Sequence, residues 1–465
     1  MSNDIRIKNG LTINLKGAAQ CITKNAAHPI SVSLNPSDFH LIIPKMVVKV
    51  GDKVNRGDTV FYSKKNESIK FCSPVDGTVH DIVRGAKRKI IEIIIKTTSV
   101  KNKSTHKAVN FEKLSPEKIK EIILNSGCWP FIKQRPYDII ANPSDTPKSI
   151  FISAFNTAPI SANLSFILND QQDEFKLGIE VLRKLSDGPI NICVEKNESS
   201  FINEIDNVNI HSISGPHPSA NVGVHIHHID PINSGDRVWT MGAEDVAILG
   251  RFFSQGIYNP VRTIAIAGPP VKSPKYYKTI VGAELKEIID DCGVNDFQSL
   301  RFINGDVLTG RKVEYDNYLG FYNNTVSVLR EGNNYRMFGW MPFVNNEVPS
   351  AYKTSFSWLF PKKKYDLDTN LNGEERAFVV TGEMEKVFPM DIYPMQLLKE
   401  CMAENIEKME SLGIYEVAPE DFSLIDYSSS SKIEAQYIIR KGLDLMISEV
   451  CLLYTSDAAD EWRSG

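Results

Sequence analysis

Residues 40–89 read HLIIPKMVVKVGDKVNRGDTVFYSKKNESIKFCSPVDGTVHDIVRGAKRK, and this stretch decides the fold of the N-terminal part of the chain. Short runs rich in β-branched residues alternate with Gly-Asp turns at 51–52 and 57–58, and an Asp-Gly turn at 76–77 answers them across the strand pair. Glycine beside aspartate between such runs is a strong hairpin signal. The repeated pattern predicts a lipoyl-like barrel-sandwich domain over residues 1–105.

The hairpin tip between the two halves of this pattern lacks the usual carrier lysine. In lipoyl and biotinyl carriers a lysine stands at that tip, because only an exposed amine can be acylated by the cofactor. Asn66 and Glu67 occupy the tip here, with Lys64 and Lys65 beside it. An offset along the chain changes the direction of a side chain, and charged residues at a tip are usually solvated. We predict the scaffold without the carrier chemistry, with modification at Lys64 or Lys65 as an alternative.

Composition excludes several classes of protein. A chain of 465 residues exceeds what one core holds, so several domains are expected. The formal net charge of −4 argues against nucleic acid as a partner. No apolar run approaches the roughly 18 residues that cross a bilayer, and the N-terminus lacks a signal-peptide pattern, which predicts a cytoplasmic protein without a transmembrane helix. The 7 cysteines form no C-x-x-C pair, so free thiols are expected.

Strands alternate with helices in the second part of the chain. A helix is predicted from Ser115 to Gly127, and the buried strands and amphipathic helices that follow are predicted at 149–155, 173–185, 190–194, 208–212, 243–253 and 261–267. This alternation predicts a Rossmann-like α/β domain with a parallel sheet over residues 106–258. The turn after the first strand, residues 156–159, contains no glycine, so the domain carries no nucleotide fingerprint.

The remainder divides into smaller regions. Residues 259–335 are predicted to form a small α/β domain, 336–390 an irregular connecting region, and 391–450 a helical domain with helices at 394–413 and 431–450. The serines 428–431 suit either a loop or the N-cap of the last helix. Residues 451–465 have no helical period, and we interpret them as a non-native tail outside the functional argument.

A histidine cluster is the first candidate site. Five of the 9 histidines lie within residues 211–228. If His225 and His227 lay on a strand, both imidazoles would face one side, and His217 or Asp230 could complete a zinc or iron site. Prolines nearby instead favour a structural loop with packed histidines. We predict no metal site, and keep a metalloenzyme using these three histidines as an alternative function.

The segment WPFIKQRPYD, residues 129–138, is the second candidate site. A quinone needs aromatic walls and one or two donors for its oxygens, which this segment offers in the side chains of Trp129, Phe131, Lys133, Arg135 and Tyr137. The competing interpretation is an interdomain connector fixed by its two X-Pro steps and its buried rings. No spacing in the chain identifies a nucleophile with its base, so the catalytic residues are unknown.

Taken in order, many segments resemble one known family. The segments that carry the resemblance are KMVVKVGDKVNRGDTVF, SPVDGTVHDIVRGAKRKI, WPFIKQRPYD, IFISAFNTAPISANL, SGPHPSANVGVHIHHIDPIN, GAELKEIID, NGDVLTGR, YLGFYNNTVSVLREG, FGWMPF, FPMDIYPMQLLKECMAENIEKMESLGIYEVAPEDFSLIDYSSSSK and IIRKGLDLM. Between Ile5 and Val450 the chain resembles the A subunits of the bacterial sodium-translocating NADH:quinone reductases, which are similar to the C subunit of the Rnf complex. The ordered set of segments carries the resemblance, since no single segment is specific.

The resemblance implies that the chain is one subunit of a larger protein complex. It implies an SLBB-like fold for residues 259–335 and a peripheral subunit on the cytoplasmic face of the bacterial inner membrane. The partners would be the other subunits of a six-subunit complex, above all its membrane subunits. The chain itself would bind no cofactor, with quinone as a candidate ligand, while NADH, flavins and iron centres belong to the partners. Serines 428–431 stand where the relatives place cluster cysteines, which agrees with that loss.

Overall fold

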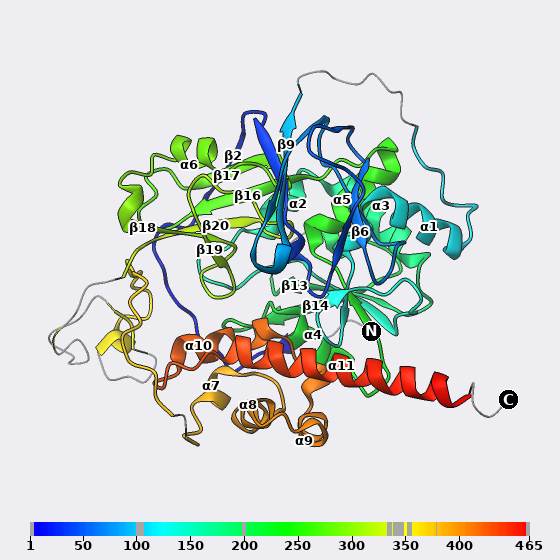
Figure 1. Ribbon diagram of the computed structural model, residues 1–465. Helices are drawn as coiled ribbons and strands as arrows, with labels where there is room; N and C mark the ends of the chain where they lie inside the picture. The colour runs from blue at the N-terminus through cyan, green and yellow to red at the C-terminus, as the bar shows by residue number, and fades with distance from the viewer. Residues whose placement is uncertain are drawn as a thin grey trace.

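The structure is a computed structural model that describes residues 4–98, 107–197, 201–332, 337, 348–350, 356–377 and 379–461. The described strands form four sheets, and the C-terminal helices pack along one side of the molecule (Figure 1).

Two small sheets make up the barrel-sandwich. Their strands are, in order, β3 (Ser31–Leu34), β9 (Ile90–Thr97), β8 (Gly77–Arg84) and β5 (Lys53–Val54) in one sheet, and β4 (Pro44–Met46), β6 (Thr59–Ser63) and β7 (Lys70–Cys72) in the other. The pairing of Lys53 with Thr78 joins the two halves of the turn pattern, as the sequence predicted. Phe61 and Phe71 pair across β6 and β7, with stacked rings 4.4 Å apart, and are buried in the core.

A seven-stranded sheet forms the centre of the predicted Rossmann-like domain. Its order is β1 (Asp4–Arg6), β14 (Asn209–Ser214), β13 (Ile190–Glu195), β12 (Ser149–Ser153), β15 (Val238–Thr240), β10 (Lys133–Arg135) and β11 (Ile139–Ile140). The pairings from β1 to β15 are parallel, which confirms the predicted parallel layer, whereas β10 and β11 extend it antiparallel. Helices α1 (Pro116–Ser126), α2 (Leu164–Asn169) and α4 (Val222–Ile229) belong to the same part of the chain.

Helices α3 (Gln172–Arg183) and α5 (Ala243–Gln255) pack directly against each other. Glycine permits this close approach. A Cβ at Gly250 would lie 1.8 Å from the carbonyl oxygen of Glu174, and one at Gly178 would lie 2.1 Å from that of Val246. Any larger side chain at either position would push the helices apart, which explains why both helices carry glycine where they meet.

A six-stranded sheet follows, with the order β19 (Arg311–Val313), β18 (Leu300–Asn304), β20 (Thr325–Arg330), β16 (Val261–Ala267), β17 (Lys275–Ile280) and β2 (Gln20–Asn25). Helix α6 (Lys286–Asp291) follows β17 in this part of the chain. The first two strands of the chain therefore pair outside the barrel-sandwich: β1 in the seven-stranded sheet and β2 here. The N-terminal segment links the two larger sheets before the chain enters the barrel-sandwich.

The C-terminal region is helical, as predicted, but its boundaries differ. It contains α7 (Met384–Val387), α8 (Pro394–Met402), α9 (Ile406–Ser411), α10 (Ser423–Ser428) and α11 (Ala435–Glu461). The single helix predicted over 394–413 is wrong. Glu404 has a φ of 55°, and the Asn405 side chain accepts a hydrogen bond from the Lys408 amide and starts a new helix.

The last helix also differs from its prediction. Helix α11 begins at Ala435, four residues beyond the last of the four serines, and continues past residue 450. Of the two roles predicted for the serines, the N-cap of the last helix is wrong, because Oδ1 of Asp426 accepts the Ala435 amide at 2.5 Å while the serines end α10. Within the ranges that the structure describes, no helix combines the length and the apolarity needed to cross a bilayer.

Candidate functional site

The segment predicted to contact quinone lies at the junction of several parts of the fold. The short 3₁₀ helix Trp129–Phe131 leads into β10 at the antiparallel side of the seven-stranded sheet. Trp129, Phe131, Arg135 and Tyr137 are all buried. Lys133 is the most accessible of the five predicted residues, with 32% of its side chain exposed. The structure thus places the five residues on strand β10 and on the residues that flank it, but their side chains contact different parts of the protein.

Both aromatic rings at the start of the segment pack against protein. The Trp129 indole donates to the carbonyl oxygen of Ala141 at 2.8 Å and meets Trp239 edge to face at 5.6 Å. Phe131 stacks on Phe321 at 4.5 Å, which joins the segment to the chain that follows β19. These contacts have the character of the interdomain connector that was the competing interpretation of this segment. Quinone contact at the five residues stays a prediction.

The other end of the segment forms a buried ionic group, which we call the Arg135 cluster: Arg135, Asp138, Glu420 and Asp421. Nη2 of Arg135 donates to Oε1 of Glu420 at 2.7 Å. Its Nε lies 3.7 Å from Oδ1 of Asp138, and its Nη1 lies 3.9 Å from Oδ2 of Asp421. One guanidinium therefore serves three carboxylates, two of which come from the C-terminal helical region.

The carboxylates of the Arg135 cluster differ in their tendency to hold a proton. Burial raises the pKa of Asp421 to about 7, because Arg135 only partly offsets the loss of hydration and Glu420 adds like charge. Burial acts in the same direction on Asp138, but Lys133 and the arginines at 135 and 440 outweigh it and lower its pKa. Asp138 thus stays ionised, whereas Asp421 titrates near neutrality.

Sequence reasoning missed a second buried group, the Arg262 cluster: Arg262, Glu244, Asp245, Gln171 and Arg251. Arg262 on β16 donates through Nη2 to Asp245 on α5, and its Nη1 lies 3.7 Å from Oε2 of Glu244. Oε1 of Glu244 accepts the Thr263 amide at 2.7 Å. The cluster joins the seven-stranded sheet's helices to the six-stranded sheet. The sequence did contain a sign of buried charge, because Glu244, Asp245 and Arg262 lie inside otherwise apolar runs.

The histidine cluster is not arranged as the metal-site alternative requires. The structure places His225 and His227 on α4, not on a strand, so their side chains point about 200° apart around the helix axis. Each histidine has its own protein partner: Thr157 at 3.1 Å for His217, the Ser219 carbonyl at 2.8 Å for His225, and Glu416 at 2.7 Å for His227. Among the residues described, no group of three metal-ligating side chains comes together.

Burial controls the protonation of two of these histidines. Loss of hydration lowers the pKa of His217 and that of His225 to about 4. Nε2 of His227 accepts the Asp391 amide at 3.0 Å, so Nδ1 carries the proton that faces Glu416. His227 therefore joins α4 to the C-terminal region, and the cluster is a set of packing contacts.

The turn after β12 is occupied by protein side chains. Oγ1 of Thr157 is 3.1 Å from Nδ1 of His217 and accepts the Ala220 amide at 3.3 Å. The Asn156 side chain accepts the Ala158 amide and closes the turn on itself. A dinucleotide pyrophosphate needs free backbone amides and glycine at this place. The residues present do not fit that group.

The hairpin tip with the alternative carrier lysines is a closed turn. The Lys64 amide donates to the Ile43 carbonyl at 2.8 Å, and the Asn66 amide donates to the Ser63 carbonyl at 3.2 Å. The side chains of Lys64 and Lys65 are exposed. The turn thus presents two solvated lysines beside the tip.

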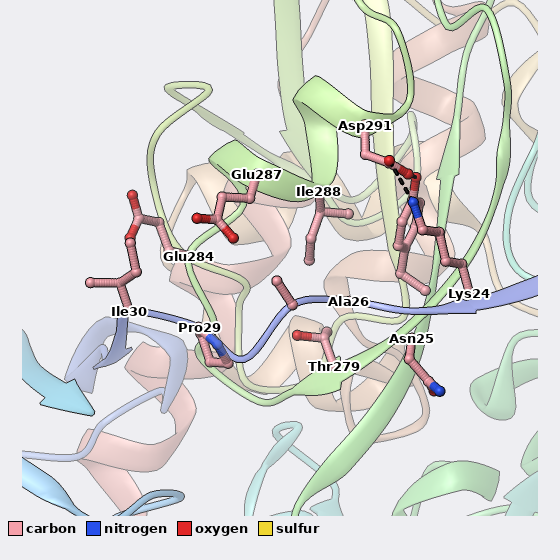
Figure 2. A pocket seen from close by; sticks show the side chains of 12 residues that line it. Lys24, Asn25, Ala26, Pro29, Ile30, Thr279, Glu284, Glu287, Ile288 and Asp291 are labelled. Carbon is pink, nitrogen blue, oxygen red and sulfur yellow. Dashed lines mark hydrogen bonds and ion pairs between the residues drawn. The ribbon is translucent and has the colours of Figure 1, made fainter. Parts of the chain in front are cut away.

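A groove of about 420 Å³ lies between the chain around β2 and helix α6. Figure 2 shows Lys24 paired with Asp291 at one side and Glu284 at the other. The remaining lining residues are Asn25, Ala26, Ala27, Pro29, Ile30, Tyr277, Thr279, Glu287 and Ile288. The carboxylates suit a cation better than the acceptor oxygens of a quinone. None of the five predicted quinone-contact residues lines this groove.

Three family models match consecutive parts of the chain. They are described as the NqrA N-terminal barrel-sandwich hybrid domain, over residues 5–98, the NqrA second alpha/beta domain, over 114–258, and the NQRA C-terminal domain, an SLBB model, over 263–315. These matches confirm the predicted barrel-sandwich, α/β and SLBB-type folds. The exact domain boundaries stay a prediction.

The chain is also similar over nearly its whole length to curated proteins. It is 34% identical to the A subunit of the Na(+)-translocating NADH-quinone reductase of Marinomonas sp. (strain MWYL1), over 96% of this chain and 99% of that protein. It is 33% identical to the protein of the same name from Photorhabdus laumondii, over 94% and 98%. A crystal structure of NAD+-reducing [NiFe]-hydrogenase aligns at 10% identity and a TM-score of 0.35, over 73% of this chain and 62% of that one, too weak a likeness for any inference.

Proposed function

Because the chain belongs to the family of A subunits of the Na+-translocating NADH-quinone reductases, we propose that it is the peripheral subunit of such a complex on the cytoplasmic face of a bacterial inner membrane. The observation that carries this proposal is the similarity of at least 33% over at least 94% of the chain. The complex it serves transfers electrons from NADH to quinone and exports sodium ions. The chain has no activity alone, and its partners are the other five subunits, above all those in the membrane.

In this proposal the chain holds no cofactor, and its partners bind NADH, flavins and iron centres. The occupied turn after β12 supports this, since Thr157 and His217 fill the place where a related nucleotide-binding domain would take a pyrophosphate. The part of the chain that contacts quinone is residues 129–138, which we call the junction. Lys133 and Arg135 supply donors for quinone oxygens there, and Trp129, Phe131 and Tyr137 supply apolar walls.

The burial of these residues sets a condition on quinone contact. Arg135 is 2% exposed, and its Nε and Nη1 make no hydrogen bond within the described part of the chain. Those two donors are available to a quinone oxygen only if the Arg135 cluster opens. Contact through Lys133 needs no such opening. The proposal therefore assigns the first contact to Lys133, and the deeper contact to Arg135 once the cluster opens around the bound quinone.

Deletion of the gene in its host tests membership on the quinone side. In membranes of the deletion strain, sodium-stimulated NADH:quinone reductase activity should be lost, while NADH oxidation by an artificial acceptor survives. Expression of the chain from a plasmid should restore quinone reduction. If both activities persist unchanged in the deletion strain, the proposed function is wrong.

The site at the junction needs a separate experiment. Quinone analogues should protect the purified full chain from limited proteolysis, and the Phe131→Ala/Arg135→Ala variant should need a higher analogue concentration for the same protection. Lys120→Ala, at a lysine that donates to the Pro143 carbonyl outside the junction, serves as the matched control. Equal protection of a folded double variant would remove quinone from these residues and leave membership of the complex intact.

A further inference from the structure

A short exposed segment combines large apolar side chains with consecutive lysines. Residues 356–364 read FSWLFPKKK. Trp358 is 53% exposed, Leu359 is 53% exposed and Phe360 is 62% exposed. We call residues 356–364 the aromatic-lysine segment. More than half of the surface of each of these three side chains meets solvent, which is unusual for residues that normally fill a core.

The segment has a defined backbone conformation. The Phe360 amide donates to the Ser357 carbonyl at 3.0 Å, which closes the 3₁₀ turn. The Asn14 side chain donates to the Pro361 carbonyl at 2.7 Å, and the Tyr365 amide donates to the Asn14 carbonyl at 2.8 Å. These bonds tie the segment to the connection between β1 and β2, at the outer edge of the molecule (Figure 1). The exposed side chains are thus presented from a fixed support.

The charge of the segment is opposite to that of the whole chain. Lys362, Lys363 and Lys364 are all exposed, and residues 356–364 contain no acid, whereas the formal net charge of the chain is −4. The next acid along the chain, Asp366, is 2.5 Å from Nη1 of Arg330, and Nζ of Lys363 lies 5.1 Å from the centre of the Tyr365 ring. A positive patch on an acidic protein selects the face that turns toward an anionic surface.

We propose that the aromatic-lysine segment docks on the anionic headgroup surface of a lipid bilayer. Trp358 and Phe360 enter the interfacial region, where aromatic rings are favoured, and the lysines contact lipid phosphates. A protein partner would bury the aromatic rings equally well, but it would not require three adjacent, exposed ammonium groups. The inference goes beyond the proposed function because it assigns a direct lipid contact to this chain, independent of any partner in the complex.

Vesicle binding by the purified full chain tests the docking surface. The chain should sediment with vesicles containing phosphatidylglycerol and not with vesicles of phosphatidylcholine alone, and binding should weaken as salt rises. K362E/K363E/K364E should lower the partition coefficient by at least about a hundredfold, since each lysine contributes a factor of about five near an anionic surface. W358S/F360S should weaken binding while leaving its salt dependence.

A matched variant separates local docking from net charge. K53E/K64E/K65E makes the same charge change at exposed lysines of the barrel-sandwich and should bind vesicles like the parent. Each variant is first checked for an unchanged thermal unfolding transition. If K362E/K363E/K364E binds like the parent, or if the barrel variant loses as much, the segment is not the docking surface.

Two further results would overturn the inference. One is equal binding of the parent chain to neutral and anionic vesicles. The other is absence of vesicle binding by the parent, combined with release of W358S/F360S from host membranes, which would assign the segment to a protein partner. Either result leaves the proposed function standing, because the deletion experiment measures complex activity without reference to lipid.

Discussion

The Arg262 cluster and the Arg135 cluster both place a buried arginine among carboxylates, but solvent reaches only one of the two clusters. At the first, the side chains of Arg262, Glu244 and Asp245 are 2%, 1% and 6% exposed. At the second, the side chain of Arg135 is 3% exposed, but that of its closest partner, Glu420, is 37% exposed.

The difference shows that similar chemistry serves two kinds of junction. Arg262 pairs with two neighbouring acids on one helix. Because all three side chains are buried, water cannot replace either acid as its partner. Arg135 faces three carboxylates, and water can solvate one of them, that of Glu420. The Arg262 cluster is therefore a closed link between helix α5 and strand β16, whereas the Arg135 cluster keeps one solvated partner, Glu420.

Loss of Arg262 should have the largest effect on stability. Arg262→Ala leaves Glu244 and Asp245 buried without their cation, which should lower the free energy of unfolding by about 3–5 kcal/mol. Urea unfolding followed by circular dichroism measures this. The control is Lys118→Ala, which removes an exposed pair with Glu121 and should change stability by less than about 1 kcal/mol. An equal loss in both variants would contradict a special role for the Arg262 cluster.

Loss of Arg135 should be milder, because solvent can stabilise part of what it leaves behind. Arg135→Ala should lower the free energy of unfolding by about 1.5–3 kcal/mol, the usual range for lost bonds to charged groups. The same urea titration compares it directly with Arg262→Ala. A loss as large as that of the Arg262 variant would mean that the two junctions are equally closed.

The Arg135 cluster should also respond to pH. The pKa of Asp421 is about 7 in the folded chain, above its ordinary value of 3.8. The folded state therefore holds this proton more tightly, so the stability it contributes is full below pH 3.8 and is lost as pH rises through about 7.

The Asp421→Asn variant removes this contribution. Between about pH 6 and pH 8 the parent should lose more unfolding free energy than the variant, by this linkage. His217 and His225, whose pKa values of about 4 act in the opposite direction, are common to both proteins and cancel in the comparison. Parallel pH profiles of parent and Asp421→Asn would show that Asp421 does not titrate in this range.

The smallest expected effect concerns the aromatic part of the junction. Trp129→Phe keeps a ring but removes the bond from the indole to the Ala141 carbonyl. The expected loss is about 1 kcal/mol in the free energy of unfolding. Tyr437→Phe, at a ring that is 55% exposed, provides a control with little change. No loss in Trp129→Phe would mean that water replaces the indole.

The local pattern of the chain was enough to predict most of the strands and helices. Residues 149–153 and 190–195 form strands because buried β-branched runs flanked by turns have few other solutions. The histidine segment was predicted to be a loop with packed histidines, but residues 222–229 form helix α4, on which His225 and His227 each have their own protein partner. The break between α8 and α9 was missed because the apolar period continues across Asn405, although asparagine is a good helix N-cap.

The two ionic clusters could not be assembled from the sequence. Arg135 and Glu420 are 285 positions apart, and no local period connects them. The five predicted quinone-contact residues were identified by their chemistry alone, which says nothing about burial. The structure adds that only Lys133 among them combines a donor with substantial exposure. Contacts between domains depend on how the sheets pack against each other, and that packing leaves no periodic pattern in the amino-acid sequence.

The most direct test of a role for the junction in quinone reduction is Arg135→Met in the purified complex, compared with the parent and with a Lys118→Met control. We predict a variant that is folded and incorporated, unchanged NADH oxidation by an artificial acceptor, and quinone reduction lowered by about tenfold, equivalent to ~1.4 kcal/mol in the barrier. Full quinone reduction by the incorporated variant would contradict a role for the Arg135 cluster in quinone reduction.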